Sequence, residues 1–367
     1  MTGCQVMAKP ASSRCNLNCR YCFYIDKPQQ AIMDDATLET FIQQHIAAQP
    51  GPEVQFAWQG GEPTLCGLDF FRRVVELQQR HGAGKRIHNA FQTNGILLND
   101  AWCIFFREQG WLVGISLDGP AALHDAYRVS RSGNPTHHKV LAAIEKLRAH
   151  QVSFNLLTVI NRQNSGQPER MYRYLRALGT PYLQFLPLQE HDNPESVSDA
   201  QWGAFLSAVF DIWVREDIGR IFVQLFDSTL GVWCGYPSQI CSLAITCGHA
   251  FALEAQGDLY QCDHYVYPEY RLGNIHQTPL AELNNSEAAI AFGLRKKNTL
   301  SGECQACPAL HLCNGDCPKH RVEGKSALCA GYLAFFRHCA PHMRVMRDLI
   351  RHHRSPIELM TLLRQSQ

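Results

Sequence analysis

The sequence predicts an α/β fold, an open and partial (β/α)6 barrel followed by a cysteine-rich extension and a C-terminal helix. Through the first half, short apolar segments alternate with helix-like stretches, which indicates βαβ units and a parallel sheet. Polar loops directly follow several of the strand candidates, as active-site loops do in parallel barrels. Cysteines then become frequent between residues 234 and 339.

Six apolar segments are strand candidates: Gln5–Ala8, Val54–Trp58, Ile87–Phe91, Leu112–Leu117, Val152–Ile160 and Tyr182–Leu188. Five stretches between them have helical patterns: Asp35–Ala48, Leu68–His81, Asp100–Gln109, His137–His150 and Pro168–Leu178. Polar loops follow at residues 59–63, 92–95, 118–120 and 189–190. Because carboxyl ends of parallel strands meet at one face of a TIM-type barrel, we expect these loops to form one active-site mouth.

The second half has a different pattern. A helix is expected over Asp199–Asp217, and a hairpin over 251–261 with its turn at Gln256-Gly257-Asp258. A basic helix is expected after Cys339, ending near His353 because Pro356 follows. These patterns predict a barrel domain at 1–234, a cysteine-rich domain at 235–340 and a helical segment at 341–367.

Composition limits the classes of partner and compartment. The 367 residues carry a net charge of +1, and 46% of them are hydrophobic. This balance gives no reason to expect nucleic acid or a membrane as a partner. We find no membrane-length apolar stretch and no secretory pattern at the N-terminus, so we expect a cytoplasmic protein. In that reducing compartment, sixteen cysteines indicate metal binding or redox chemistry more than disulfides.

Cys15, Cys19 and Cys22 lie in the run SSRCNLNCRYCFY. Three soft thiolates on one short loop favour an iron–sulfur cluster, zinc or copper(I). A [4Fe–4S] cluster normally takes four cysteines, and no cysteine follows Cys22 until Cys66. A trio therefore predicts one iron open to a substrate or cofactor, which would make the cluster catalytic.

The cysteine-rich half supplies eight further candidate ligands, enough for two four-cysteine sites: Cys241, Cys247, Cys262, Cys304, Cys307, Cys313, Cys317 and Cys329. The spacing Cys304-x2-Cys307 is also typical of half a zinc ribbon, so spacing alone favours zinc and iron–sulfur clusters equally. The N-terminal trio favours iron–sulfur clusters over zinc in this half, because electrons made or consumed at the N-terminal cluster need a route through the protein.

Five cysteines receive no role: Cys4, Cys66, Cys103, Cys234 and Cys339. Cys103 lies on a helix face with aromatic neighbours, so we expect a buried, unreactive side chain.

Several motifs carry a resemblance to a known family: AKPASSRCNLNCRYCFY, WQGGEPTL, QTNGILLND, GISLDGP and QCDHYVYP. The trio and the loop Gly60-Gly61-Glu62-Pro63 resemble the radical S-adenosylmethionine superfamily. The later cysteines resemble its SPASM extension. In this order, from Lys9 to beyond Cys329, the motifs resemble those of the anaerobic sulfatase-maturating enzymes.

The resemblance implies three [4Fe–4S] clusters and S-adenosylmethionine as cofactors. It implies that a 5′-deoxyadenosyl radical takes a β-hydrogen from a cysteine or serine in the Cys/Ser-x-Pro-x-Arg motif of a sulfatase, giving Cα-formylglycine. It also implies a low-potential electron donor such as flavodoxin or ferredoxin. Two alternatives remain: another SPASM peptide maturase, for example one forming thioethers, and a non-catalytic zinc-binding protein.

The resemblance also implies contacts to S-adenosylmethionine from Tyr21, Gly60, Gly61, Glu62, Ser116, Arg128 and Gln189. The two glycines would allow close backbone approach, and Glu62 would accept a hydrogen bond from the cofactor's amino group. Arg128 would bind its carboxylate, although without the resemblance we would expect Arg128 at the surface. At Gln189 only a backbone contact is expected.

Asp263 directly follows Cys262 and matches the general base of the family. Without the resemblance, a turn-forming aspartate would be favoured. The ligand sets implied are Cys241, Cys247, Cys262 and Cys317 for one auxiliary cluster and Cys304, Cys307, Cys313 and Cys329 for the other. Asp316 stands where the family often has glycine, a small departure in the loop before Cys317.

Overall fold

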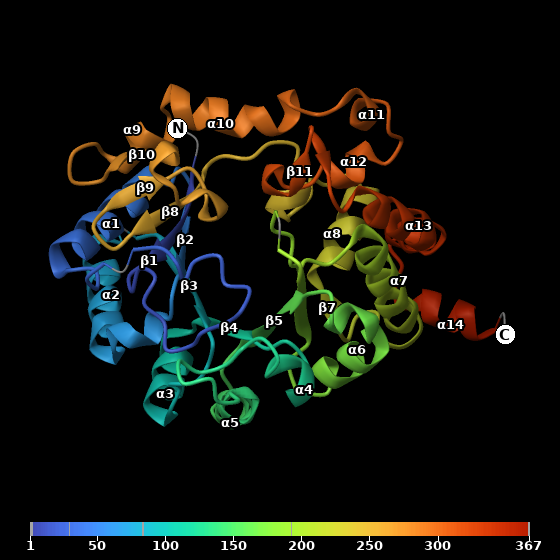
Figure 1. The fold of residues 1–367 in the computed structure, drawn as a ribbon, viewed down its shortest axis with the longest axis horizontal. Helices are drawn as coiled ribbons and strands as arrows, with labels where there is room; N and C mark the ends of the chain where they lie inside the picture. The colour runs from blue at the N-terminus through green and yellow to red at the C-terminus, as the bar shows by residue number, and fades with distance from the viewer. Residues whose placement is uncertain (1–2, 29, 83, 192, 366–367) are drawn as a thin grey trace. The chain divides into compact units, whose positions relative to one another are not determined.

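The computed structural model describes residues 3–28, 30–82, 84–191 and 193–365 (Figure 1). Its residues form two compact units that do not follow chain order. Unit 1 contains residues 1–116, 125–154 and 247–295, and unit 2 contains residues 117–124, 155–246 and 296–367. The domain boundary expected at 234/235 therefore does not coincide with the division into these two units, because residues 247–295 belong to the same unit as the N-terminal strands.

Unit 1 is built on a sheet with the strand order β10-β9-β8-β1-β2-β3-β4. Its strands are β1 (Gln5–Lys9), β2 (Glu53–Trp58), β3 (Arg86–Thr93), β4 (Leu112–Ser116), β8 (Ala250–Glu254), β9 (Asp258–Tyr260) and β10 (Arg271–Asn274). The strands from β8 to β4 run parallel, and β9 and β10 continue the sheet in antiparallel pairing. The expected hairpin is confirmed, and its first strand pairs with β1 in parallel.

The helices of unit 1 are α1 (Asp35–Ala48), α2 (Leu68–His81), α3 (Asp100–Gln109), α5 (His137–Ala149), α9 (Leu280–Asn284) and the first part of α10 (Glu287–Asn298). The bounds of α1, α2 and α3 agree with the sequence prediction, and α1 and α3 each begin at a capping side chain. Asp34 caps α1 by accepting a hydrogen bond from the backbone N–H of Thr37 at 2.8 Å, and Asn99 caps α3 in the same way.

Aromatic side chains fill the core of this unit between the sheet and the helices. Phe71 of α2 packs edge-to-face on Phe91 of β3, with ring centroids 4.9 Å apart. Trp102 and Phe106 of α3 and Trp111 pack around Phe91, and all five side chains are buried. Large rings of this kind supply much of the apolar area that stabilises a sheet covered by helices.

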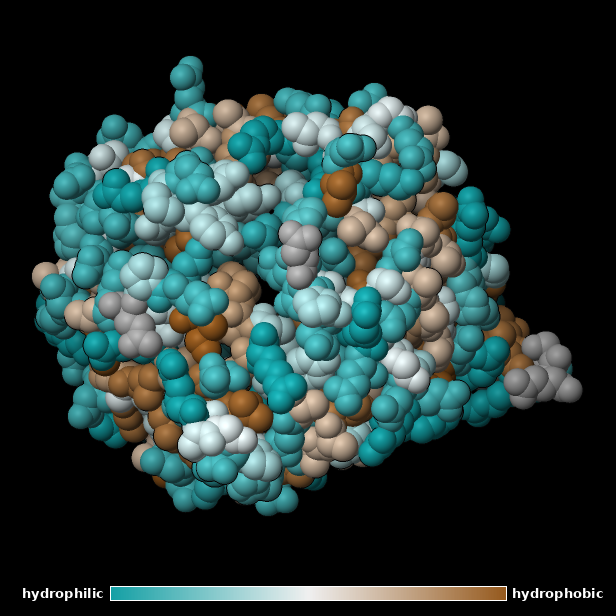
Figure 2. Space-filling view, in the orientation of Figure 1, coloured by the Kyte–Doolittle hydropathy of each residue, from teal (hydrophilic) through white to brown (hydrophobic). Residues whose placement is uncertain are grey.

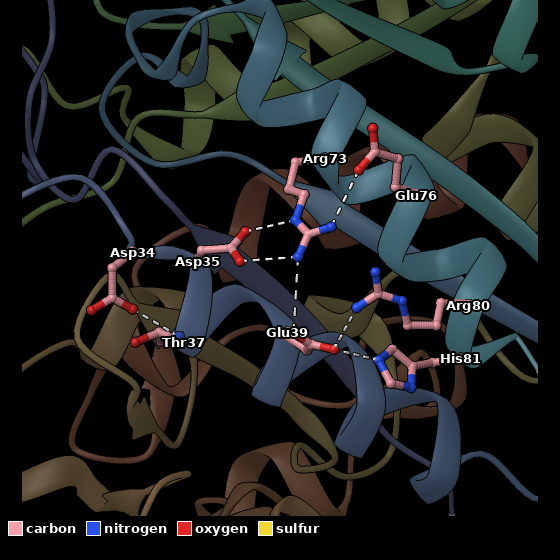
Figure 3. Close-up of polar contacts among 8 residues, drawn as sticks. All are labelled: Asp34, Asp35, Thr37, Glu39, Arg73, Glu76, Arg80 and His81. Atoms are coloured by element: carbon pink, nitrogen blue, oxygen red, sulfur yellow. Dashed lines mark hydrogen bonds and ion pairs between the residues drawn. The ribbon is translucent and has the colours of Figure 1, made fainter.

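Ion pairs join the outer faces of α1 and α2 (Figure 3). Arg73 of α2 binds Asp35 of α1 through two nitrogens at 2.8 and 3.0 Å, and Glu39 contacts Arg80 and His81. These groups are half-buried or exposed, so water screens their charges and the ion pairs contribute little to stability.

Unit 2 contains the parallel strands β5 (Phe154–Ile160, apart from its first residue), β6 (Tyr182–Pro187) and β7 (Phe222–Val223). Its other elements are α4 (Ala121–His124), α6 (Pro168–Arg176), α7 (Asp199–Glu216), α8 (Gln224–Trp233), α11 (Gly302–Gln305), α12 (Leu310–Cys313), the hairpin of β11 (Arg321–Val322) and β12 (Lys325–Ser326), α13 (Cys329–Arg351) and α14 (Glu358–Gln365).

Helices α7 and α13 pack closely because two glycines meet between them. A Cβ atom on Gly203 would lie 2.7 Å from the carbonyl oxygen of Gly331, so neither position has room for a side chain. The expected start of the last helix, after Cys339, is wrong: α13 begins at Cys329 and contains Pro341. Packing against α7 stabilises the extra turns despite the helix-breaking tendency of proline.

Hydrophilic residues predominate on the face drawn in Figure 2, with hydrophobic residues scattered among them. Within the described ranges, every helix is too short or too polar to cross a membrane.

Candidate active site

The loop that carries Cys15, Cys19 and Cys22 follows β1 in unit 1. Backbone hydrogen bonds hold it against the segment before α5: Asn18 N–H donates to Val129 O at 2.8 Å, and Arg20 N–H donates to Tyr127 O at 3.0 Å. Cys22 N–H donates to Cys19 O at 3.1 Å, which closes a turn between these two cysteines. The loop is therefore fixed by the backbone, and its three cysteines are all partly buried.

The surroundings of Cys15 fit a metal-bound thiolate. Its Sγ atom accepts from the backbone N–H of Leu17 at 3.4 Å and from the side-chain amide of Asn94 at 3.8 Å. Burial raises the pKa of the Cys15 thiol to about 11, so the free side chain stays protonated at neutral pH. A bound metal ion would favour the thiolate, and soft thiolates suit iron–sulfur clusters.

Gly60 and Gly61 lie in the loop after β2 with positive φ angles of 87° and 47°. A Cβ atom on Gly61 would lie 2.1 Å from the carbonyl oxygen of Arg14, in the cysteine loop. A Cβ atom on Gly60 would lie 2.5 Å from Cγ of Lys9. We expected these glycines to allow approach of a cofactor, and the structure gives them a second purpose: they allow the β2 loop to pack on β1 and the cysteine loop.

Glu62 is buried, with 1% of its surface exposed, and its carboxylate joins two loops. One oxygen accepts from Thr93 Oγ1 at 2.7 Å and from Thr64, and the other accepts from the backbone N–H of Asn94 at 2.8 Å. Burial raises the pKa of Glu62, although these hydrogen bonds oppose the shift. Glu62 is therefore held in one orientation, beside the residue that contacts Cys15.

Arg128 is a buried residue with 9% exposure, so the surface position expected without the resemblance is wrong. Its guanidinium carbon lies 5.4 Å from the ring centroid of Tyr21, which itself packs on Tyr127 at 5.9 Å. Ser116, the last residue of β4, accepts a hydrogen bond from the Gln92 amide at 3.0 Å. Unit 1 thus contains every predicted cofactor contact except Gln189, which follows β6 in unit 2.

Asp263 begins a short 3-10 turn in unit 1, directly after Cys262. Its Oδ1 lies 2.5 Å from the ammonium nitrogen of Lys9, and its Oδ2 accepts from the Gln59 amide at 3.3 Å. Burial opposes ionisation of the carboxyl, but the charges of Lys9 and His264, with hydrogen bonds from Lys9 and Gln59, together outweigh burial and lower the pKa of Asp263. The predicted base is therefore a charged, ion-paired carboxylate.

Sequence reasoning gave no role to Lys9 or to Glu254, which lie on the adjacent strands β1 and β8. Glu254 accepts from Ser12 Oγ at 3.1 Å and from the Tyr24 hydroxyl. Burial raises the pKa of Glu254. A lysine within the otherwise uncharged strand QVMAK was the available signal, but only the pairing of β1 with β8 brings these side chains together.

In unit 2, four cysteines of one predicted set line a single cavity: Cys304, Cys307, Cys313 and Cys329. Four cysteines around one cavity match the number of ligands that a [4Fe–4S] cluster takes. Asp316 also lines this cavity, with φ at 58°, and its Oδ2 contacts His320 Nδ1 at 2.9 Å and Ser326 Oγ at 2.8 Å. These two partners hold a non-glycine residue in a conformation that glycine adopts more easily.

The other predicted set is divided between the units: Cys247 and Cys262 belong to unit 1, and Cys241 and Cys317 to unit 2. Among the cysteines without a role, Cys103 and Cys339 are fully buried. Burial raises the pKa of Cys103 to about 11 and that of Cys339 to about 12, as expected of packed thiols.

Comparisons with known proteins identify two domain families in the chain. The model of the radical SAM superfamily matches residues 10–175, and the SPASM model, an iron–sulfur cluster-binding domain, matches residues 245–308. The chain is 40% identical to the serine-type anaerobic sulfatase-maturating enzyme of Bacteroides thetaiotaomicron, over 98% of this chain and 95% of that protein. It is 33% identical to the cysteine-type enzyme of Clostridium perfringens, over 92% and 96%.

Solved structures agree in fold. Native anSMEcpe with bound AdoMet superposes with a TM-score of 0.88 at 32% identity, covering 94% of this chain and 99% of that one. The same protein with AdoMet and the Cp18Cys peptide gives a TM-score of 0.87 over the same shares. With relatives this similar over nearly the whole sequence, the chain belongs to the anaerobic sulfatase-maturating enzymes, a family of radical SAM enzymes with an iron–sulfur cluster-binding extension.

Proposed function

We propose that this enzyme converts a cysteine or serine in the Cys/Ser-x-Pro-x-Arg motif of a sulfatase to Cα-formylglycine. The observation that carries the proposal is the ion-paired carboxylate of Asp263, placed directly after Cys262 and in the same unit as the Cys15–Cys22 loop. The names of its relatives and the peptide bound to anSMEcpe support this substrate class.

Cys15, Cys19 and Cys22 would hold one [4Fe–4S] cluster. Tyr21, Gly60, Gly61, Glu62, Ser116, Arg128 and the Gln189 backbone would contact S-adenosylmethionine. The two remaining cysteine sets would hold auxiliary clusters. When bound, this cofactor and its cluster supply a 5′-deoxyadenosyl radical, and an auxiliary cluster supplies an electron acceptor. Hydrogen bonds from Thr64, Thr93 and Asn94 orient the Glu62 carboxylate for its proposed contact with S-adenosylmethionine.

Asp263 would act after the β-hydrogen has left the substrate as a hydrogen atom. The substrate must then lose one electron and one proton to complete a two-electron oxidation. Asp263 would take the proton from the sulfur or oxygen, and an auxiliary cluster would supply the acceptor for the electron. A serine gives the aldehyde directly, whereas a cysteine gives a thioaldehyde that water converts to the aldehyde with loss of hydrogen sulfide. A general base must lie within hydrogen-bond reach of its proton.

The radical step would use one electron and the later oxidation of the substrate would release one, so a low-potential donor such as flavodoxin or ferredoxin is required to supply the first electron. We place the enzyme in the cytoplasm, where a reducing environment would keep its sixteen cysteines available as ligands.

A peptide assay tests the proposal. Anaerobically prepared, reduced protein is incubated with S-adenosylmethionine and synthetic peptides that carry Ser-x-Pro-x-Arg or Cys-x-Pro-x-Arg. We expect 5′-deoxyadenosine and a hydrazide-reactive aldehyde at the target residue of at least one peptide. Cofactor cleavage with both peptides unchanged would reject sulfatase maturation, and a thioether product would favour the other SPASM chemistry. Colourless protein containing zinc would reject all of the radical chemistry.

A further inference from the structure

Lys9, the last residue of β1, is a buried lysine whose side chain is 2% exposed. Its aliphatic stem passes over Gly60, where a Cβ atom would lie 2.5 to 3.1 Å from Cγ, Cβ and Cδ of Lys9. The loop after β2 therefore leaves a space that the lysine stem fills. Removing an ammonium group from water is costly, so its position requires a compensating interaction.

The compensating interaction is with Asp263. The Lys9 ammonium lies 2.5 Å from Oδ1 of Asp263 and 4.2 Å from the centroid of the Tyr24 ring. The other nearby acid, Glu254, accepts hydrogen bonds from Ser12 and Tyr24. Lys9 is thus the charged partner of the carboxylate proposed to act as the base.

The contacts of Asp263 fix both oxygens of its carboxylate. Lys9 binds Oδ1, and the Gln59 amide contacts Oδ2 from the loop after β2. Asp263 itself lies in a short 3-10 turn, which restrains its backbone less than a long helix or strand would. The orientation of the carboxylate therefore depends on groups from β1 and from the β2 loop.

We propose that Lys9 is a positioning residue for proton removal: through its ion pair it holds the Asp263 carboxylate where the substrate proton is taken. This inference rests on the proposed function. The reaction has two steps that depend differently on Asp263. Hydrogen-atom abstraction does not need its carboxylate, whereas completion of the oxidation does. Loss of Lys9 should therefore uncouple the two parts instead of slowing both.

The test uses cluster-loaded full-length protein and a target peptide deuterated at the β-carbon. Deuterium in 5′-deoxyadenosine reports abstraction, and the aldehyde reports completion. For Lys9→Met we expect unchanged iron content and deuterium transfer, with at least about a tenfold fall in aldehyde per deuterated 5′-deoxyadenosine. Lys9→Arg, which keeps the charge, should restore part of this ratio. Lys139→Met, the same change on the exposed side of α5, is the matched control and should leave the ratio unchanged.

An unchanged ratio in Lys9→Met would overturn the proposal. If Lys9→Met loses iron, deuterium transfer and aldehyde in parallel, Lys9→Gln is the deciding variant. An unchanged ratio of aldehyde to deuterated 5′-deoxyadenosine in Lys9→Gln would assign Lys9 a structural role alone. The wild-type arm tests the proposed function separately. Deuterated 5′-deoxyadenosine without aldehyde in the wild-type protein would reject formylglycine formation, and the role of Lys9 with it.

Discussion

The buried acidic residues of unit 1 differ in the groups that surround their carboxylates. Glu62 and Glu254 are buried with hydrogen-bond donors around them, whereas Asp263 is paired with a full positive charge. Desolvation raises the pKa of all three carboxyls, but for Asp263 the contributions of Lys9, His264 and Gln59 together outweigh it and lower the pKa. Of these acids, Asp263 is therefore the one whose surroundings favour the charged form needed to accept a proton.

Replacing Asp263 with asparagine tests this difference. Asp263→Asn keeps the size of the side chain and removes its proton affinity, so we expect all clusters and cofactor cleavage to remain. Formylglycine formation should fall by about 10²- to 10⁴-fold, the usual contribution of a general base. Iron analysis, 5′-deoxyadenosine yield and aldehyde yield measure these quantities in one preparation. Turnover equal to the wild type would remove Asp263 from the mechanism.

At the scale of helices and strands, local patterns predicted the first half of the fold well. Strands β1 to β6 and helices α1, α2 and α3 could be predicted because the periodicity of apolar residues is a local signal. The pairing of β8 with β1 joins residues about 245 positions apart, and no local pattern carries that information. For the same reason the sequence identified Asp263 but gave no role to Lys9.

Helix α1 packs on β2 through His45, which provides a pH-dependent contact. The ring lies 4.8 Å from the Phe56 ring, and Nε2 lies 2.9 Å from Gln55 O. Burial lowers the pKa of His45 from 6.5 to about 4. Between these values the unfolded chain binds a proton that the folded protein does not. The free energy of unfolding should therefore fall by about 2 kcal/mol between pH 7 and pH 5 from this group alone.

His45→Gln removes this titration. Anaerobic denaturant unfolding of both proteins at pH 7 and pH 5 should show their difference in stability narrowing by about 2 kcal/mol at the lower pH. Parallel pH curves for the two proteins would show that His45 does not remain neutral in the fold.

The contact between α7 and α13 supports the cavity lined by cysteines, because Cys329 is the first residue of α13. In Gly203→Ala the new methyl group would collide with the backbone of Gly331, so we expect a loss of about 1–3 kcal/mol in stability and lower iron occupancy. Gly231→Ala in α8 is the control, since nothing lies within 4 Å of its new methyl group. Equal iron content and equal melting temperatures in both variants would contradict the prediction.

At the scale of the whole molecule, two groups of cysteine ligands lie in different units. The Cys15–Cys22 loop lies in unit 1, and the cavity of Cys304, Cys307, Cys313 and Cys329 lies in unit 2. Loss of one group should therefore leave the other able to bind its metal.

The variant in which alanine replaces Cys15, Cys19 and Cys22 tests this independence. It should lose cofactor cleavage completely and retain about eight irons in two [4Fe–4S] clusters. Iron and sulfide analysis with electron paramagnetic resonance measures the remaining clusters. Loss of all iron would show that the auxiliary sites depend on the N-terminal loop.

The pairing of β1 with both β2 and β8 also has a consequence for synthesis of the chain. A ribosome adds about 5–20 residues per second, so roughly 200 residues and 10–40 s separate the emergence of β2 from that of β8. During this interval one edge of β1 has no neighbouring strand, and an open edge invites pairing with other chains. Slow translation or early termination should therefore promote aggregation of the nascent chain, before any cofactor is required.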